Sequence, residues 1–152
     1  MRLFVFLHVT TMFLAVASSG GAEILVHRVA GTRDLPGIRT VLATYGVIAR
    51  FIPILFLIGF AFGLTAVFVE GFNPFQGWLI LAYVLFASGV AVGAIVNGGW
   101  ANRLAAASAQ ATDANDPAFV AALDDRSGII GLWVFWLITV ALVFVMIVKP
   151  LS

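Results

Sequence analysis

Hydrophobic residues gather in four long, nearly uninterrupted runs along the chain, separated by shorter polar segments. The runs have about 19 to 24 residues each, and a membrane-spanning helix needs roughly 20. They are continuous rather than alternating, which favours helices over the strands of a transmembrane barrel. Inside a bilayer only helices and closed barrels satisfy every backbone group. The pattern therefore predicts an all-α, membrane-spanning four-helix bundle in a single domain, with helices at about 3–26, 37–70, 78–101 and 128–148.

Proline and its neighbours mark the expected helix starts and bends. Pro36 opens the second helix, whose first turns are expected to lie partly in the inner interface, and Pro53 should kink it. Asn73-Pro74 is a turn signal, so helices two and three should form an antiparallel hairpin. Asp116-Pro117 has the order of an N-cap and a first helical residue, which predicts a short helix at about 117–125.

The amino-acid composition indicates that lipid, rather than water, surrounds most of the chain. The 152 residues are 62% hydrophobic and 10% charged, with a mean hydropathy of +1.12, whereas a soluble domain carries roughly 25% charged residues. The lipid bilayer is therefore the first partner that we predict. The chain has no cysteine, which excludes disulfides and thiolate sites, and its net charge of +1 argues against a nucleic-acid partner.

Basic residues are distributed unevenly between the two sides of the predicted bundle. Six arginines flank or occupy the first and third loops, and the termini hold Arg2 and Lys149. Positive residues favour the cytoplasmic side, so both termini should lie outside, as in a multi-pass protein of a bacterial inner membrane. A cleaved signal peptide ending near Ala15-Val16-Ala17 is the alternative for the first run, but it would place the arginine-rich loop outside. The six are Arg28, Arg33, Arg39, Arg50, Arg103 and Arg126.

The first helix carries a stripe of small and polar residues that includes His8. An ionisable group inside the membrane is a functional candidate, and neutral imidazole serves as an axial haem ligand or a proton relay. The structural alternative is a histidine that hydrogen-bonds Thr11, Tyr83 or a backbone carbonyl. His27 lies roughly 28 Å farther along the helix, so a second haem histidine would have to come from another His8 or a partner subunit.

Other polar and small residues form three further groups. Glu23 and His27 are spaced to pair on one helix, and with Arg50 they predict an interfacial polar cluster; a metal site would need more histidines than the two present. Two G-x-x-x-G pairs indicate close helix packing within the chain or a homodimer face, and they are Gly59 with Gly63 and Gly89 with Gly93. The acidic third loop is a solvated surface or, alternatively, a docking surface for a soluble partner.

Short motifs carry a resemblance to known membrane families. Phe6-Leu7-His8-Val9, with Ile58-Gly59 and Gly63-Leu64, resembles an uncharacterised family of bacterial four-helix predicted integral membrane proteins. It is distantly similar to the copper-resistance D domain and to HemJ-type protoporphyrinogen oxidases. The HemJ-type likeness implies haem b and porphyrinogen oxidation, with His8 the one matching residue. The copper branch implies copper handling on the outer side, for which the methionines are too scattered, and the uncharacterised branch implies no activity.

These observations leave three functional hypotheses. The first is a non-catalytic dimer or a small subunit of a larger membrane complex, which the glycine pairs and the acidic loop favour. The alternative is a haem b protein for electron transfer or porphyrin chemistry, with His8 as axial ligand. A small transporter or channel ranks third, because no pair of broken helices is evident beyond Pro53. Whether the protein is an enzyme stays open at this stage.

Overall fold

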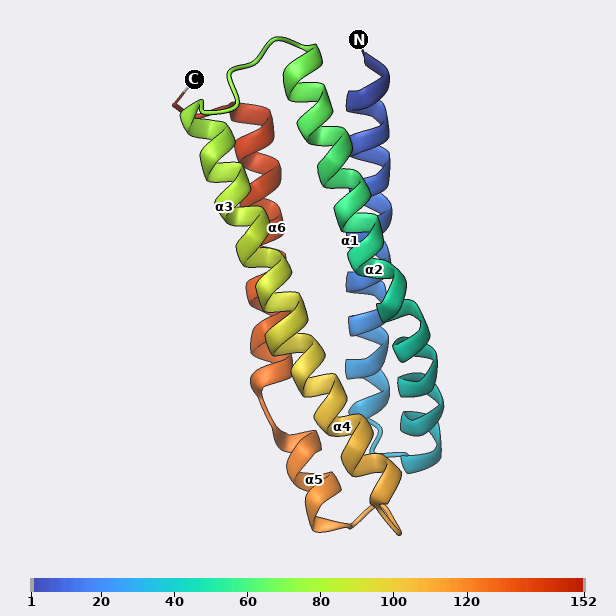
Figure 1. The fold of residues 1–152 in the computed structure, drawn as a ribbon. Coiled ribbons are helices and arrows are strands. Elements are labelled where there is room, and N and C mark those ends of the chain that lie inside the picture. Colours follow the sequence, from blue (N-terminus) through green and yellow to red (C-terminus); the bar gives the residue numbers. More distant parts are fainter. Residues whose placement is uncertain (1, 152) are drawn as a thin grey trace.

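Four helical stretches, each long and apolar enough to cross a membrane, run along most of the chain (Figure 1). The computed structural model describes residues 2–151. The prediction of an all-α protein with four membrane helices is confirmed. In order, the elements are α1 (Arg2–Ala30), α2 (Leu35–Val69), α3 (Gly77–Ala91), the π-helical η1 (Val92–Asn97), α4 (Gly98–Gln110), α5 (Pro117–Asp124) and α6 (Ser127–Val148). The third stretch is one continuous helix made of α3, η1 and α4.

Two helices have a proline in their first turn, and an aspartate caps the N-terminus of each. Asp116 caps α5, since its carboxylate accepts hydrogen bonds from the backbone N–H groups of Ala118 and Phe119. Asp34 caps α2 in the same way through Gly37, at 3.0 Å. The helix therefore begins at Leu35, two residues before the expected start at 37.

The helices pack as two antiparallel pairs, α1 with α2 and α3 with α6 (Figure 1). The predicted glycine pairs lie inside these contacts. A Cβ placed on Gly59 would come within 2.7 Å of the Met12 sulfur, and one on Gly63 within 2.6 Å of His8. Gly89 lies against α6 with slightly more room, because Ile138 would be 3.3 Å from its Cβ. The glycines thus bring helices of one chain together.

The two pairs are joined at the end of the bundle where α5 lies. A hydrophobic cluster there takes residues from α1, α2, α4 and α5, with Ile38, Leu104 and Phe119 almost fully buried. Arg39 of α2 donates to the carbonyl oxygens of Ser108 and Ala111, both at 2.8 Å, and so closes the last turn of α4.

Two further arginines bind the acidic residues of the third loop. Arg33 pairs with Asp124 at 2.7 Å, and Arg103 pairs with Asp125 at 2.8 Å. Bonds from the Ser127 backbone N–H and from Arg103 lower the pKa of Asp125 to about 2. These carboxylates hold the corner between α5 and α6, so the loop is a structural part of the bundle.

The pairs separate towards the opposite end, which holds both ends of the chain (Figure 1). A second hydrophobic cluster lies there, built chiefly by α3 and α6 with Val67 of α2. Leu79, Ala82 and Val145 are its most buried members together with Trp78. α1 contributes nothing to this cluster, which leaves space between the two pairs.

Two of the membrane helices depart from a regular α-helix. Pro53 lies within α2, and Figure 1 shows the axis of this helix bending near its middle, as expected for a residue that removes a backbone donor. The second departure, η1, was not predicted. Its sequence, Val92 to Asn97, carries no local breaker other than Gly93, so the insertion depends on packing rather than on propensity.

Trp100 differs most from its expected place. A tryptophan near the inner end of a membrane helix is typically an interfacial anchor. The side chain is instead 4% exposed and is stacked on the His27 ring at 4.3 Å between centroids. Gly128 of α6 also lies against the Trp100 ring. The helix continues for ten residues beyond it as α4, so Trp100 belongs to the core.

We predict opposite effects of alanine at two neighbouring glycines of α1. A Cβ on Gly20 would collide with the ring of Trp136, whereas one on Gly21 would meet nothing within 4 Å. Gly20→Ala should lower the free energy of unfolding by about 1–3 kcal/mol, the usual cost of overpacking. Gly21→Ala should leave it unchanged or slightly higher. Denaturant titration in detergent micelles measures both, and equal effects would contradict this packing.

Candidate functional site

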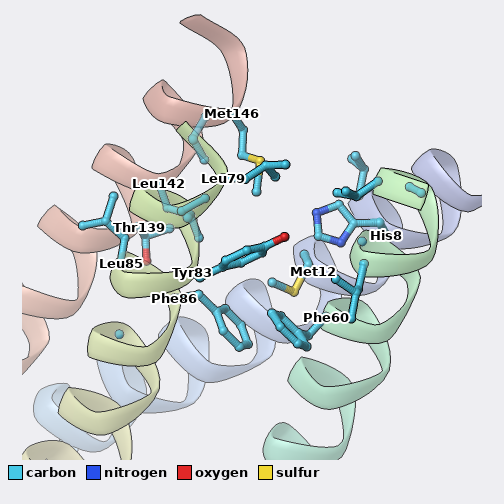
Figure 2. A pocket seen from close by; sticks show the side chains of 18 of the residues that line it. His8, Met12, Phe60, Leu79, Tyr83, Leu85, Phe86, Thr139, Leu142 and Met146 are labelled. Carbon is cyan, nitrogen blue, oxygen red and sulfur yellow. The ribbon is translucent and has the colours of Figure 1, made fainter. Parts of the chain in front are cut away.

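A cavity of about 650 Å³ lies between the two helix pairs, in the half of the bundle where they separate. Its wall is aliphatic and aromatic, with contributions from α1, α2, α3 and α6. Figure 2 shows side chains from these helices facing one another across it. Ligand pockets typically measure about 300–1,000 Å³ and combine an apolar wall with a few polar groups. This cavity fits that description, and its polar groups are His8, Glu70, Tyr83, Thr139 and Lys149.

His8 is held by one hydrogen bond, which fixes the proton on its ring. Nδ1 lies 2.7 Å from the carbonyl oxygen of Gly59. A carbonyl oxygen can only accept, so Nδ1 donates, and the neutral ring carries a free lone pair on Nε2. The predicted structural alternative, a bond to a backbone carbonyl, is therefore observed. It uses one nitrogen, and the ring still lines the cavity.

Tyr83 faces His8 from the opposite wall. Figure 2 shows the Tyr83 hydroxyl and the His8 ring pointing towards one another. Phe60 makes an edge contact with the tyrosine ring at 6.1 Å between centroids and stacks on Phe86 at 5.1 Å. The hydroxyl oxygen is buried and has no hydrogen-bond partner among the described residues.

The terminal end of the cavity carries charge. Lys149 places its ammonium 4.5 Å from the centre of the Phe72 ring and 5.2 Å from that of Trp78, a cation–π arrangement. Glu70, at the end of α2, also lines the cavity, and its Oε1 is buried with no partner in the described part of the chain. An acidic side chain, Glu70, and a basic one, Lys149, are thus both placed where they can contact the polar end of a ligand.

A second buried polar contact lies in the other half of the bundle. The Asn97 side chain donates to Glu23 Oε2 at 2.9 Å, and both residues are less than 7% exposed. The π-helical η1 ends at Asn97. Gly131 of α6 makes room for the Asn97 amide oxygen, which a Cβ would strike. This contact ties α1 to the third helix, and it lies apart from the cavity.

The structure gives the three residues of the predicted interfacial cluster different surroundings. Glu23 bonds Asn97, His27 stacks on Trp100, and Arg50 is exposed on α2. Within residues 2–151, no three histidine or carboxylate side chains are grouped closely enough to hold a metal ion. The i,i+4 spacing of Glu23 and His27 allowed a pair, but the contact of Glu23 with η1 provides it with a neutral partner instead.

Sequence reasoning named Thr11 and Tyr83 as alternative hydrogen-bond partners of His8 but did not identify the rim of the cavity. Glu70 and Lys149 each follow the C-terminal end of a helix, α2 and α6, but the two helices are far apart in sequence and no local pattern links them. No local pattern in the sequence pairs Asn97 with Glu23. Its partner depends on the π-helical turn, which changes the direction of the side chain.

No family model, no curated protein and no solved structure matches the chain. The resemblance carried by Phe6 to Val9 therefore remains a prediction. What the structure does support is an integral membrane helical protein with a large apolar cavity.

Proposed function

We propose that this integral membrane protein binds haem b in the cavity, with Nε2 of His8 as an axial ligand. The observation that supports it most is the bond from Nδ1 to the Gly59 carbonyl. Metal-bound histidines usually donate their other ring N–H to such an acceptor, which fixes the tautomer and the ring orientation. His8 has this arrangement, with Nε2 left for a ligand.

The remaining wall suits a large, flat and mostly apolar group. Phe60, Phe86 and their neighbours would exclude water from it, and Lys149 at the rim would bind a carboxylate. Glu70 lies at the same end and would have to be neutral or to bond a protonated carboxyl group. Haem supplies electron transfer or porphyrin chemistry when bound, and the chain's own residues would hold and shield it.

The two histidines of the chain provide a matched test. The purified protein, loaded with hemin where necessary, should show a Soret band that His8→Ala abolishes and that added imidazole restores. His27→Ala should keep the band, because His27 stacks on Trp100 and does not line the cavity. A wild-type protein without a Soret band, or a band that His8→Ala leaves unchanged, would rule the proposal out.

A non-catalytic dimer or a small subunit of a larger membrane complex is the second candidate function. Since the glycine pairs are used within the chain, α6 offers the better interface. Trp133, Leu137 and Ile147 are 69%, 71% and 75% exposed. They belong to a stripe of apolar residues whose spacing alternates between three and four, as in a helix–helix seam. The stripe consists of Ile130, Trp133, Leu137, Val140, Phe144 and Ile147.

Cross-linking in membranes tests this interface on a chain that has no native cysteine. If two copies meet along α6, Leu137→Cys should form a disulfide-linked dimer under mild oxidation. Ile95→Cys, which is 72% exposed on η1, should not. Absence of a dimer with both variants, and of any co-purifying subunit, would leave the second candidate without support.

We also propose that both termini lie on the outer side of a bacterial inner membrane. The six arginines that lie in or near the first and third connections support this orientation. A membrane-impermeant maleimide applied to intact spheroplasts should therefore label Phe75→Cys, in the second connection, and spare Ala114→Cys, in the third. Both positions are exposed, and the reverse labelling would invert the topology.

A further inference from the structure

The hydroxyl of Tyr83 is one of two buried polar atoms in the cavity wall that have no hydrogen-bond partner among the described residues, and the other is Oε1 of Glu70 at the rim. The Tyr83 hydroxyl is buried, and no described residue accepts from it or donates to it. A buried hydroxyl without a partner is unfavourable and rare in native proteins. Such an atom in a cavity wall indicates that the partner comes with the ligand.

The tyrosine ring is held so that this hydroxyl stays in the cavity. Phe60 contacts it edge-on, and Phe86 stacks on Phe60. A phenol turns only about two side-chain bonds, and its ring flip leaves the oxygen in place, so the hydroxyl keeps facing His8 as Figure 2 shows. A group bound to His8 Nε2 would therefore have Tyr83 on its other side.

We propose that Tyr83 is the second recognition group of the cavity and donates a hydrogen bond to a small acceptor ligand, of the size of azide or cyanide, held opposite His8. The inference rests on the proposed haem site, because it takes the space between His8 and Tyr83 as the position of the haem. It adds that the axial position away from His8 is open to an external ligand. Tyr83 would then favour ligands that accept a hydrogen bond strongly over ligands that accept one weakly.

Methionine is the competing occupant of that position. The thioethers of Met12 and Met146 also line the cavity, and a thioether is a common second axial ligand of haem. If either sulfur were bound, the position would be closed and Tyr83 would have no small ligand to recognise. The spectrum and the ligand titration of the same sample separate these two cases.

The test compares the two tyrosines of the chain. Azide is titrated into the ferric, hemin-loaded protein, and carbon monoxide into the reduced protein. Tyr83→Phe should weaken azide binding about tenfold, the effect of one lost hydrogen bond, and should change carbon monoxide binding by less than about twofold, because carbon monoxide is a poor acceptor. Tyr45→Phe is the control, since Tyr45 packs against the hydrophobic cluster at the other end of the bundle; it should change neither affinity.

Each outcome has a distinct meaning. Equal azide affinity in wild type and Tyr83→Phe, with the Soret band retained, overturns the role of Tyr83 alone. A His8-dependent Soret band that azide does not shift shows a closed axial position and also overturns it. A wild-type protein with no Soret band overturns the proposed function and this inference together. Retention of the band and of helical circular dichroism in Tyr83→Phe shows that the variant is folded.

Discussion

The close approach of α1 to α2 is the contact on which the candidate site depends. It exists because Gly59 and Gly63 have no side chains on the face that meets Met12 and His8. With the backbones this near, the His8 ring reaches the Gly59 carbonyl, and its proton is fixed on Nδ1. A larger residue at either glycine would push the histidine away from the acceptor. The same small-residue packing thus joins the helices and determines the chemistry of His8.

The position of the cavity follows from an uneven distribution of contacts between the two pairs. At the end that contains α5, aromatic packing, the Glu23–Asn97 bond and the Arg39 bonds to α4 all connect one pair with the other. At the opposite end, the cluster around Leu79 is built mainly by α3 and α6. The bundle is therefore closed at one end and open at the other, and an apolar ligand could enter from the lipid without breaking the inner contacts.

The long apolar runs predicted the fold because a membrane helix must carry its hydrophobicity within its own sequence. Caps were predictable for the same reason, as Asp116 shows, because the cap lies next to the helix that it begins. The partners of Glu23, His27 and Trp100 were not, because each lies on another helix and depends on how the pairs meet. The π-helical turn at Val92–Asn97 adds to this, since it rotates Asn97 relative to the stripe that a regular helix would give. His8 was identified from its type and depth, but Gly59 as its partner required the structure.

Buried polar atoms without a partner are found in both halves of the bundle, and those of one half line the cavity. Glu23 is deeply buried, yet it has the Asn97 amide as a partner, so it is explained by packing alone. Among the described residues, four buried side-chain atoms lack a partner, and those of Glu70 and Tyr83 line the large cavity with His8. Burying such atoms is unfavourable unless something else pairs with them. A wall of aromatic and aliphatic side chains would be more stable without them, and their presence around one cavity is therefore the strongest physical argument that it holds a ligand with both a large apolar body and polar ends.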